Sequence, residues 1–186
     1  MKKKRLLDAY PTKFLGGGAG AVTTAQIDFT VQPQGAQTEW CWAAVSASVS
    51  VFFDPRSPWT QCKVASAERQ ADCCANGLSS TCNHWWYLDK ALTRTGNLAS
   101  VVQGALDDNS ISTDLQAKNP VCLRVEWADQ SGHFLGIYGI YPDSGGITRL
   151  LLTDPIYGES DRSKADMSGH YQNNDGTWTH TYRTRP

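Results

Sequence analysis

One cysteine in this sequence stands where a thiol can do covalent chemistry. Cys41 lies between two tryptophans in the stretch TEWCWAAVSAS, and small and apolar residues follow it without a glycine or proline. This run predicts a buried helix that begins near Cys41 and stops before Asp54. Because the first turn of a helix offers free N–H groups and the positive end of the helix dipole, it stabilises a thiolate. Cys41 is therefore a candidate nucleophile, and a buried packing cysteine is the alternative interpretation.

A nucleophilic thiol needs a general base, an acid that orients the base, and hydrogen-bond donors for the oxyanion. His133 begins the strand predicted for GHFLGIYGIY, where it can face a cleft while its neighbours fill the core. Asp154 ends the next predicted strand, in LLLTDP, and antiparallel pairing would bring it back beside His133. The backbone N–H of Cys41 is one oxyanion donor. A glutamine side chain just upstream could supply the other, and three are available: Gln32, Gln34 and Gln37.

Three stretches of the chain, QGAQTEWCWAAVSASV, GHFLGIYGI and LLLTDP, together resemble the papain-like cysteine peptidases. The resemblance is to the small bacterial branch, which includes type III effector cysteine proteases and double-glycine leader peptidases. It covers roughly residues 27–158. It implies a catalytic triad in which Cys41 is the nucleophile, His133 the base and Asp154 the orienting acid.

The same resemblance bears on the oxyanion site and on the reaction. The family usually places its oxyanion glutamine where this chain has Gly35, so the neighbouring Gln34 is preferred and Gln37 is the alternative. The reaction implied is hydrolysis of a peptide or protein substrate through a thioester, with no metal and no cofactor. The enzyme could be a secreted effector or toxin or a processing protease, and the need for a host activating factor stays open. The alternatives are a transpeptidase, amidase or deamidase with the same triad, and a disulfide-stapled binding domain without enzymatic activity.

The order of the hydrophobic patterns predicts helices first and an antiparallel sheet second, which is an α+β fold. This is the plan of a minimal papain-like fold, with the active site in the cleft between the two halves. Helices are expected over 41–53, 60–70, 84–96 and 110–119. Strands are expected over 27–31, 121–127, 132–142, 148–155 and 177–184.

The composition fits one soluble globular domain. The chain has 186 residues, 40% apolar residues and a net charge of −1, which argues against a nucleic-acid-binding surface. No apolar run approaches the roughly 20 residues that span a bilayer. Residues 1–25 are expected to form a flexible arm before a domain over 26–186, and this arm lacks the apolar stretch of a Sec signal. The sequence leaves the localisation open. Export by a non-Sec route and processing at Gly16–Gly18 are two further interpretations that stay open.

Four of the six cysteines gather in a short stretch, as Cys62, Cys73, Cys74 and Cys82. Their spacing does not follow the usual zinc patterns, so disulfides or plain thiols are favoured over a metal site. Adjacent cysteines do not readily pair with each other, but Cys73 and Cys74 could each reach Cys62 or Cys82. Cys122 is expected to be a small buried apolar residue. The aromatic residues of 85–87 are expected to pack within a helix, and residues 105–110 to form a solvated acidic loop.

Overall fold

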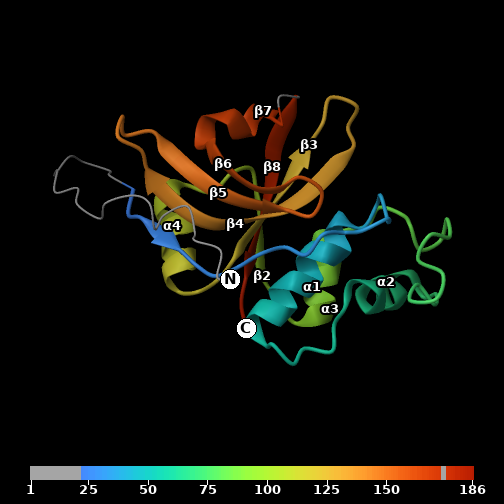
Figure 1. Ribbon diagram of the computed structural model, residues 1–186. Helices are drawn as coiled ribbons and strands as arrows, with labels where there is room; N and C mark the ends of the chain where they lie inside the picture. The colour runs from blue at the N-terminus through green and yellow to red at the C-terminus, as the bar shows by residue number, and fades with distance from the viewer. Residues whose placement is uncertain (1–21, 173–174) are drawn as a thin grey trace, which may run out of the picture.

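The computed structural model describes residues 22–172 and 175–186 (Figure 1). The arm predicted over residues 1–25 therefore lies almost wholly outside the described residues, and so does Gly16–Gly18. The helices are α1 (Cys41–Phe53), α2 (Gln61–Arg69), α3 (Leu88–Thr95), α4 (Asp108–Gln116) and the 3₁₀ helix η2 (Lys164–Met167). The strands are β1 (Ala25–Gln26), β2 (Leu98–Gln103), β3 (Val121–Glu126), β4 (Gly132–Pro142), β5 (Thr148–Asp154), β6 (Gly158–Ser163), β7 (Ser168–Tyr171) and β8 (Gly176–Thr184).

The strands form one antiparallel sheet in the order β2-β8-β3-β4-β5-β6, with β1 paired to β4 and β7 paired to β8. Helices α1, α2 and α3 lie together on one side of this sheet, and α4 lies beside β1 (Figure 1). The helical half and the sheet predicted from the sequence are thus both present, and the α+β prediction is confirmed. Within the described residues, no helix has the length and apolar character needed to cross a membrane.

Helix α1 is the structural centre of the helical half. Its first ten residues are all buried, because alanines and serines leave room for neighbours on every side. It contacts α2, α3 and the central strand β4. Its N-cap residue, Trp40, forms no side-chain cap, so no side chain of Trp40 occupies the N–H groups of the first turn. The prediction of a buried helix from Cys41 to before Asp54 is confirmed.

Other helix boundaries follow local capping chemistry. The Thr60 side chain accepts a hydrogen bond from Lys63 N at the start of α2. Helix α3 ends at Gly96, whose φ of 86° is the left-handed conformation that glycine favours. The start of α4 corrects the sequence prediction: Asp107 caps it by accepting from Ser110 N, so this acidic stretch begins a helix and is not a solvated loop.

The segment predicted as a strand over 27–31 is extended but forms no ladder there; β1 covers only Ala25–Gln26. Its predicted alternation is nevertheless present, since Ile27, Phe29 and Val31 are buried. Isolated hydrogen bonds hold the segment against the sheet, and they include those from Ile27 N to Tyr138 O and from Val31 N to Thr153 Oγ1. The segment carries the chain from the sheet to the start of α1.

Candidate active site

Two neighbouring strands bring His133 and Asp154 together. His133 is the second residue of β4, and Asp154 is the last residue of β5, which pairs with β4 in antiparallel register. His133 Nε2 lies 2.8 Å from Asp154 Oδ2. His133 is 4% exposed and Asp154 3% exposed, so water hardly competes for this bond.

The Asp154 carboxylate receives four hydrogen bonds. Oδ1 accepts from the backbone N–H groups of Ile156 (2.7 Å) and Tyr157 (2.9 Å) in the turn that follows. Oδ2 accepts from His133 and from the Tyr171 hydroxyl, which lies 2.7 Å away. Burial raises the pKa of this carboxyl, but the bond and charge of His133 and the other donors outweigh burial and lower it. Asp154 is therefore an ionised acceptor with a fixed orientation.

Cys41 reaches the same histidine from the helical half. It is one of the two free cysteines of the described residues and it begins α1. Burial by itself lowers the pKa of the His133 imidazole, but the hydrogen bond with Asp154, followed by a hydrogen bond and charge interaction with Cys41, raises it to about 10. The structure thus brings the three residues predicted as a triad together around the His133 imidazole.

The two candidate oxyanion glutamines occupy different surroundings. Gln34 is buried, its backbone N–H donates to the carbonyl oxygen of Pro155 beside Asp154, and its side-chain Nε2 donates to Gln37 O over 2.7 Å. The Gln37 side chain instead lies against Gly77, where an added Cβ would be 2.9 Å from Gln37 Nε2. Gln34 is therefore on the side of His133 and Asp154. Gln37 instead faces the loop between α2 and α3, residues 70–87, which we call the cysteine-rich loop.

The cysteine-rich loop supports the segment that leads into α1. Disulfides join Cys62 to Cys74 and Cys73 to Cys82, so the four clustered sulfur atoms are bonded in pairs. Two backbone carbonyls of this loop accept hydrogen bonds from the tryptophans beside Cys41. Trp40 Nε1 donates to Cys82 O (2.7 Å), and Trp42 Nε1 donates to His84 O (3.1 Å).

A second pair of bonds ties the loop to the residues just before Trp40. Asn83 accepts from the backbone N–H of Glu39 and donates to the Thr38 hydroxyl. Both flanking tryptophans are buried. Cys122, the other free cysteine, is fully buried as predicted, and burial raises the pKa of its thiol.

Three exposed aromatic residues are found near His133 and before α3. Tyr157 is 52% exposed and presents its ring to His133 at 6.0 Å between ring centroids. Trp85 and Tyr87 are also more than half exposed, which corrects the prediction that they pack within a helix; they precede α3. Only Trp86 of that group packs inward, with Nε1 donating to Glu68 and its ring covered by the Arg69 guanidinium.

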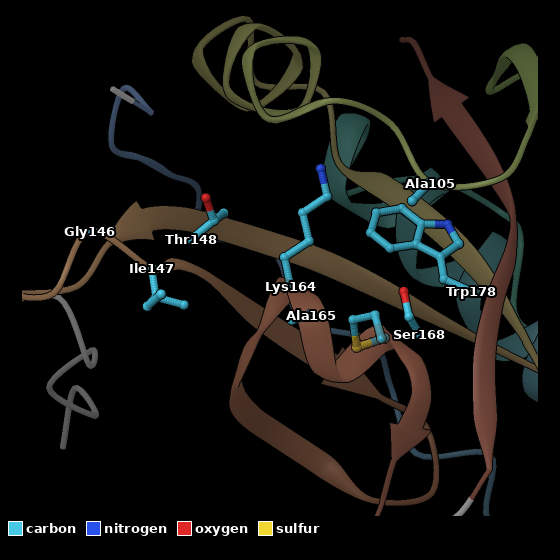
Figure 2. A pocket seen from close by; sticks show the side chains of 9 residues that line it. Ala105, Gly146, Ile147, Thr148, Lys164, Ala165, Ser168 and Trp178 are labelled. Carbon is cyan, nitrogen blue, oxygen red and sulfur yellow. The ribbon is translucent and has the colours of Figure 1, made fainter. Parts of the chain in front are cut away.

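A separate pocket lies elsewhere on the sheet (Figure 2). It has a volume of about 440 Å³, and Lys164 and Trp178 are among the residues that line it. The Lys164 ammonium donates to Leu106 O and to Asp108, on the side of α4. None of the predicted triad residues lines this pocket. Among the described residues, no group of three or more His, Cys, Asp or Glu side chains is arranged to hold a metal.

Comparison with solved structures finds cysteine proteases and an avirulence protein of similar architecture. The proform of the Amb a 11 cysteine protease, a major ragweed pollen allergen, matches with a TM-score of 0.56 at 10% identity, over 88% of this chain and 65% of that one. The Pseudomonas avirulence protein AvrPphB matches over 86% of this chain and 98% of its own, at 13% identity and a TM-score of 0.42. Bromelain from Ananas comosus matches at 14% identity and a TM-score of 0.48, over 90% and 95% of the two chains. No curated protein sequence matches.

The fold is papain-like, with a helix that carries a cysteine at its start packed against an antiparallel sheet. A family model described as "Papain-like cysteine protease AvrRpt2" matches residues 22–175. The chain belongs to this family and is a cysteine protease. The resemblance read from the sequence to papain-like peptidases and type III effector proteases is confirmed.

Proposed function

We propose that the chain hydrolyses peptide bonds with Cys41 as the nucleophile, His133 as the general base and acid, and Asp154 as the residue that orients His133. The observation that carries this proposal is the buried hydrogen bond between His133 and Asp154, with Cys41 at the start of α1 acting on the same imidazole. Each of the three is a residue type that its role requires.

The reaction follows from this arrangement. The Cys41 thiolate attacks the carbonyl carbon of the peptide bond, and the resulting oxyanion accepts hydrogen bonds from the Cys41 N–H and from Gln34 Nε2. The His133 imidazolium gives its proton to the leaving amine, which leaves a thioester on Cys41. His133 then takes a proton from water, whose oxygen attacks the thioester and releases the acid product and the thiolate. Asp154 holds the imidazole in one tautomer and keeps its own charge.

A peptide or protein is therefore the substrate class. Membership of the AvrRpt2 family supports a role as a bacterial effector protease, and two disulfides are typical of proteins that work outside a reducing cytosol. In this proposal residues 1–25 form an arm that precedes the peptidase domain of residues 26–186. A processing protease would differ from an effector in its target, and a cleavage profile compared with that of Cys41→Ala identifies the target.

A thiol-directed peptide electrophile tests the proposal. We expect the electrophile to label Cys41 stoichiometrically. Labelling should be lost in Cys41→Ala and should persist in Cys122→Ala, the matched change at the other free cysteine. Mass spectrometry of peptide products then separates hydrolysis, which adds water, from transpeptidation, which adds an amine. Labelling and cleavage that survive in Cys41→Ala would refute the assignment of the nucleophile.

A further inference from the structure

We propose that Tyr171 is a positioning residue for catalysis, holding the Asp154 carboxylate so that Oδ2 stays directed at His133; this inference rests on the proposed triad. The Tyr171 hydroxyl donates to Asp154 Oδ2 over 2.7 Å, and the same oxygen is 2.8 Å from His133 Nε2. One carboxylate oxygen is thus shared between the imidazole and a phenol.

The two oxygens of Asp154 are held in different ways. Oδ1 accepts from two backbone N–H groups, which belong to the turn at Ile156 and Tyr157. Of the four donors to the Asp154 carboxylate, only His133 and Tyr171 bond to Oδ2, so without Tyr171 only His133 would remain. The number of protons on His133 changes twice in each catalytic cycle, whereas a phenol remains protonated. The Tyr171 hydroxyl therefore gives Oδ2 a donor that is present at every step.

Burial raises the pKa of the Tyr171 hydroxyl first, and the negative charge of Asp154 raises it further. The group accordingly keeps its proton throughout the pH range in which a cysteine peptidase works. It acts as a neutral donor to a charged acceptor, which is a stronger hydrogen bond than one between two neutral groups.

The surroundings of Tyr171 fix its ring. The side chain is fully buried and stacks on Trp127, with ring centroids 6.1 Å apart and an interplanar angle of 24°. Tyr171 pairs with Gly176 of β8, and a Cβ at that glycine would lie only 2.5 Å from Trp127 Cζ3. The absence of a side chain at Gly176 therefore leaves room for the stacked rings. A ring held in this way delivers its hydroxyl to one point, which is Asp154 Oδ2.

A positioning role has a signature that simple core packing lacks. The Tyr171 hydrogen bond draws negative charge away from the oxygen that His133 uses. Removing the hydroxyl leaves more charge on that oxygen, so the imidazolium should be held more tightly and lose its proton at higher pH. At the same time the carboxylate gains freedom to rotate, and fewer His133 side chains are correctly oriented for proton transfer.

The decisive variant is Tyr171→Phe, which keeps the ring and removes one oxygen. We expect kcat to fall about tenfold, in line with the loss of a hydrogen bond to a charged group. KM should stay within about twofold, and the alkaline limb of the pH profile of kcat/KM should move up by roughly half a pH unit. Tyr182→Phe is the matched control, since Tyr182 is a buried tyrosine whose ring packs on Phe134. It should leave both kcat and the alkaline limb unchanged.

A second change covers the case in which Tyr171→Phe folds poorly. Site-specific 3-fluorotyrosine at position 171 retains the hydroxyl and the packing but makes the phenol a stronger donor. It should move the alkaline limb in the opposite direction, to lower pH. Cys41→Ala and Asp154→Asn, measured in the same series, test the triad itself: activity that survives in them refutes the proposed function.

If the triad variants are inactive while both changes at Tyr171 leave kcat and the pH profile as in the wild type, Tyr171 is a structural residue only and the inference is wrong.

Discussion

The indole nitrogen of Trp40 donates to the backbone carbonyl of Cys82 over 2.7 Å, and Cys82 is one half of the disulfide to Cys73. Trp40 directly precedes Cys41 in the chain. The start of helix α1 is therefore held in place by a loop whose own shape depends on a covalent cross-link. The other disulfide, from Cys62 to Cys74, joins the same loop to α2 but supplies no such bond to Trp40.

The two disulfides should differ in their effect on the active site. Replacing Cys73 and Cys82 together by Ser should lower the free energy of unfolding by about 2–3 kcal/mol, because the loop is no longer closed. It should also slow labelling of Cys41, since Trp40 loses its fixed partner. Urea unfolding and the rate of labelling measure the two effects. The matched double change of Cys62 and Cys74 should cost similar stability and alter labelling less; equal slowing in both variants would contradict the special link through Trp40.

Replacing Asp154 by Asn should reduce kcat by about 10³- to 10⁴-fold, because a neutral amide no longer fixes the required tautomer of His133 or stabilises the imidazolium. The amide oxygen can still accept from the backbone of residues 156 and 157, so stability should fall by only about 1–2 kcal/mol. Asp161→Asn is the control: Asp161 also accepts from a tyrosine hydroxyl and pairs with Arg149. A kcat for Asp154→Asn within tenfold of that control would remove Asp154 from the proposed triad.

The two glutamines allow a direct comparison. Gln34→Ala should lower kcat by about 10²- to 10³-fold, the usual effect of losing one oxyanion donor. Gln37→Ala should leave kcat nearly unchanged, because its side chain faces Gly77 in the disulfide-bonded loop. Steady-state kinetics on a cleaved peptide decides between them. The reverse order of effects would transfer the role to Gln37.

The pH dependence of stability follows from the raised pKa of His133. Burial opposes the charged imidazole, but Asp154 and Cys41 together raise its folded-state pKa to about 10, above the unfolded value of about 6.5. The resulting stabilisation is complete below pH 6.5 and is lost as the pH rises toward 10. Asp154 has a lowered pKa, so its contribution is present above about pH 3.9 and is lost as the pH falls below that value.

Urea unfolding between pH 6 and pH 10 measures the first effect. The free energy of unfolding of the wild type should decline across this range more steeply than that of His133→Gln, which has no imidazole to titrate. Parallel curves for the two proteins would show that His133 carries no raised pKa in the folded state.

The arm supplies a further prediction, on residues that the structure does not describe. Glycines at 16–18 and 20 make few demands on the side-chain pockets of a cleft, and about 25 extended residues reach roughly 80 Å. We expect the enzyme to cut its own arm near Gly16–Gly20. N-terminal sequencing of wild type and Cys41→Ala after parallel incubation tests this. A wild-type arm that remains whole while the preparation cleaves other peptides would exclude self-processing.

Local patterns in the sequence predicted the helix and the strands that carry the proposed triad. Cys41 opens a helix made of small residues, and His133 and Asp154 stand at the ends of strongly apolar strands, so their positions followed from periodicity and antiparallel pairing. The strand β6, with the sequence GESDRS, was missed because it contains no apolar residue and pairs with β5 at the edge of the sheet. Polar edge strands are specified by their neighbour and carry no hydrophobic signal of their own.

Tyr171 was missed for a related reason. It lies in the short strand β7, SGHY, where a single tyrosine among small and polar residues gives no period. Its ring is placed beside Asp154 by contacts that the local sequence does not show. These are the pairing of β7 with β8 and the stacking on Trp127, which is more than forty positions earlier in the chain. The choice between Gln34 and Gln37 also depends on contacts between distant residues, because the Gln37 side chain lies against Gly77 of the disulfide-bonded loop.

The place of β8 in the sheet has a consequence for the cell that makes the protein. This strand follows every other described strand in the chain, yet it lies in the interior of the sheet, between β2 and β3. A ribosome releases the chain from its N-terminus, so Cys41, His133 and Asp154 emerge while their sheet still lacks an inner member. A nascent chain should therefore be unable to cut proteins around it. We expect proteolysis to begin only once residues 176–184 have inserted between β2 and β3.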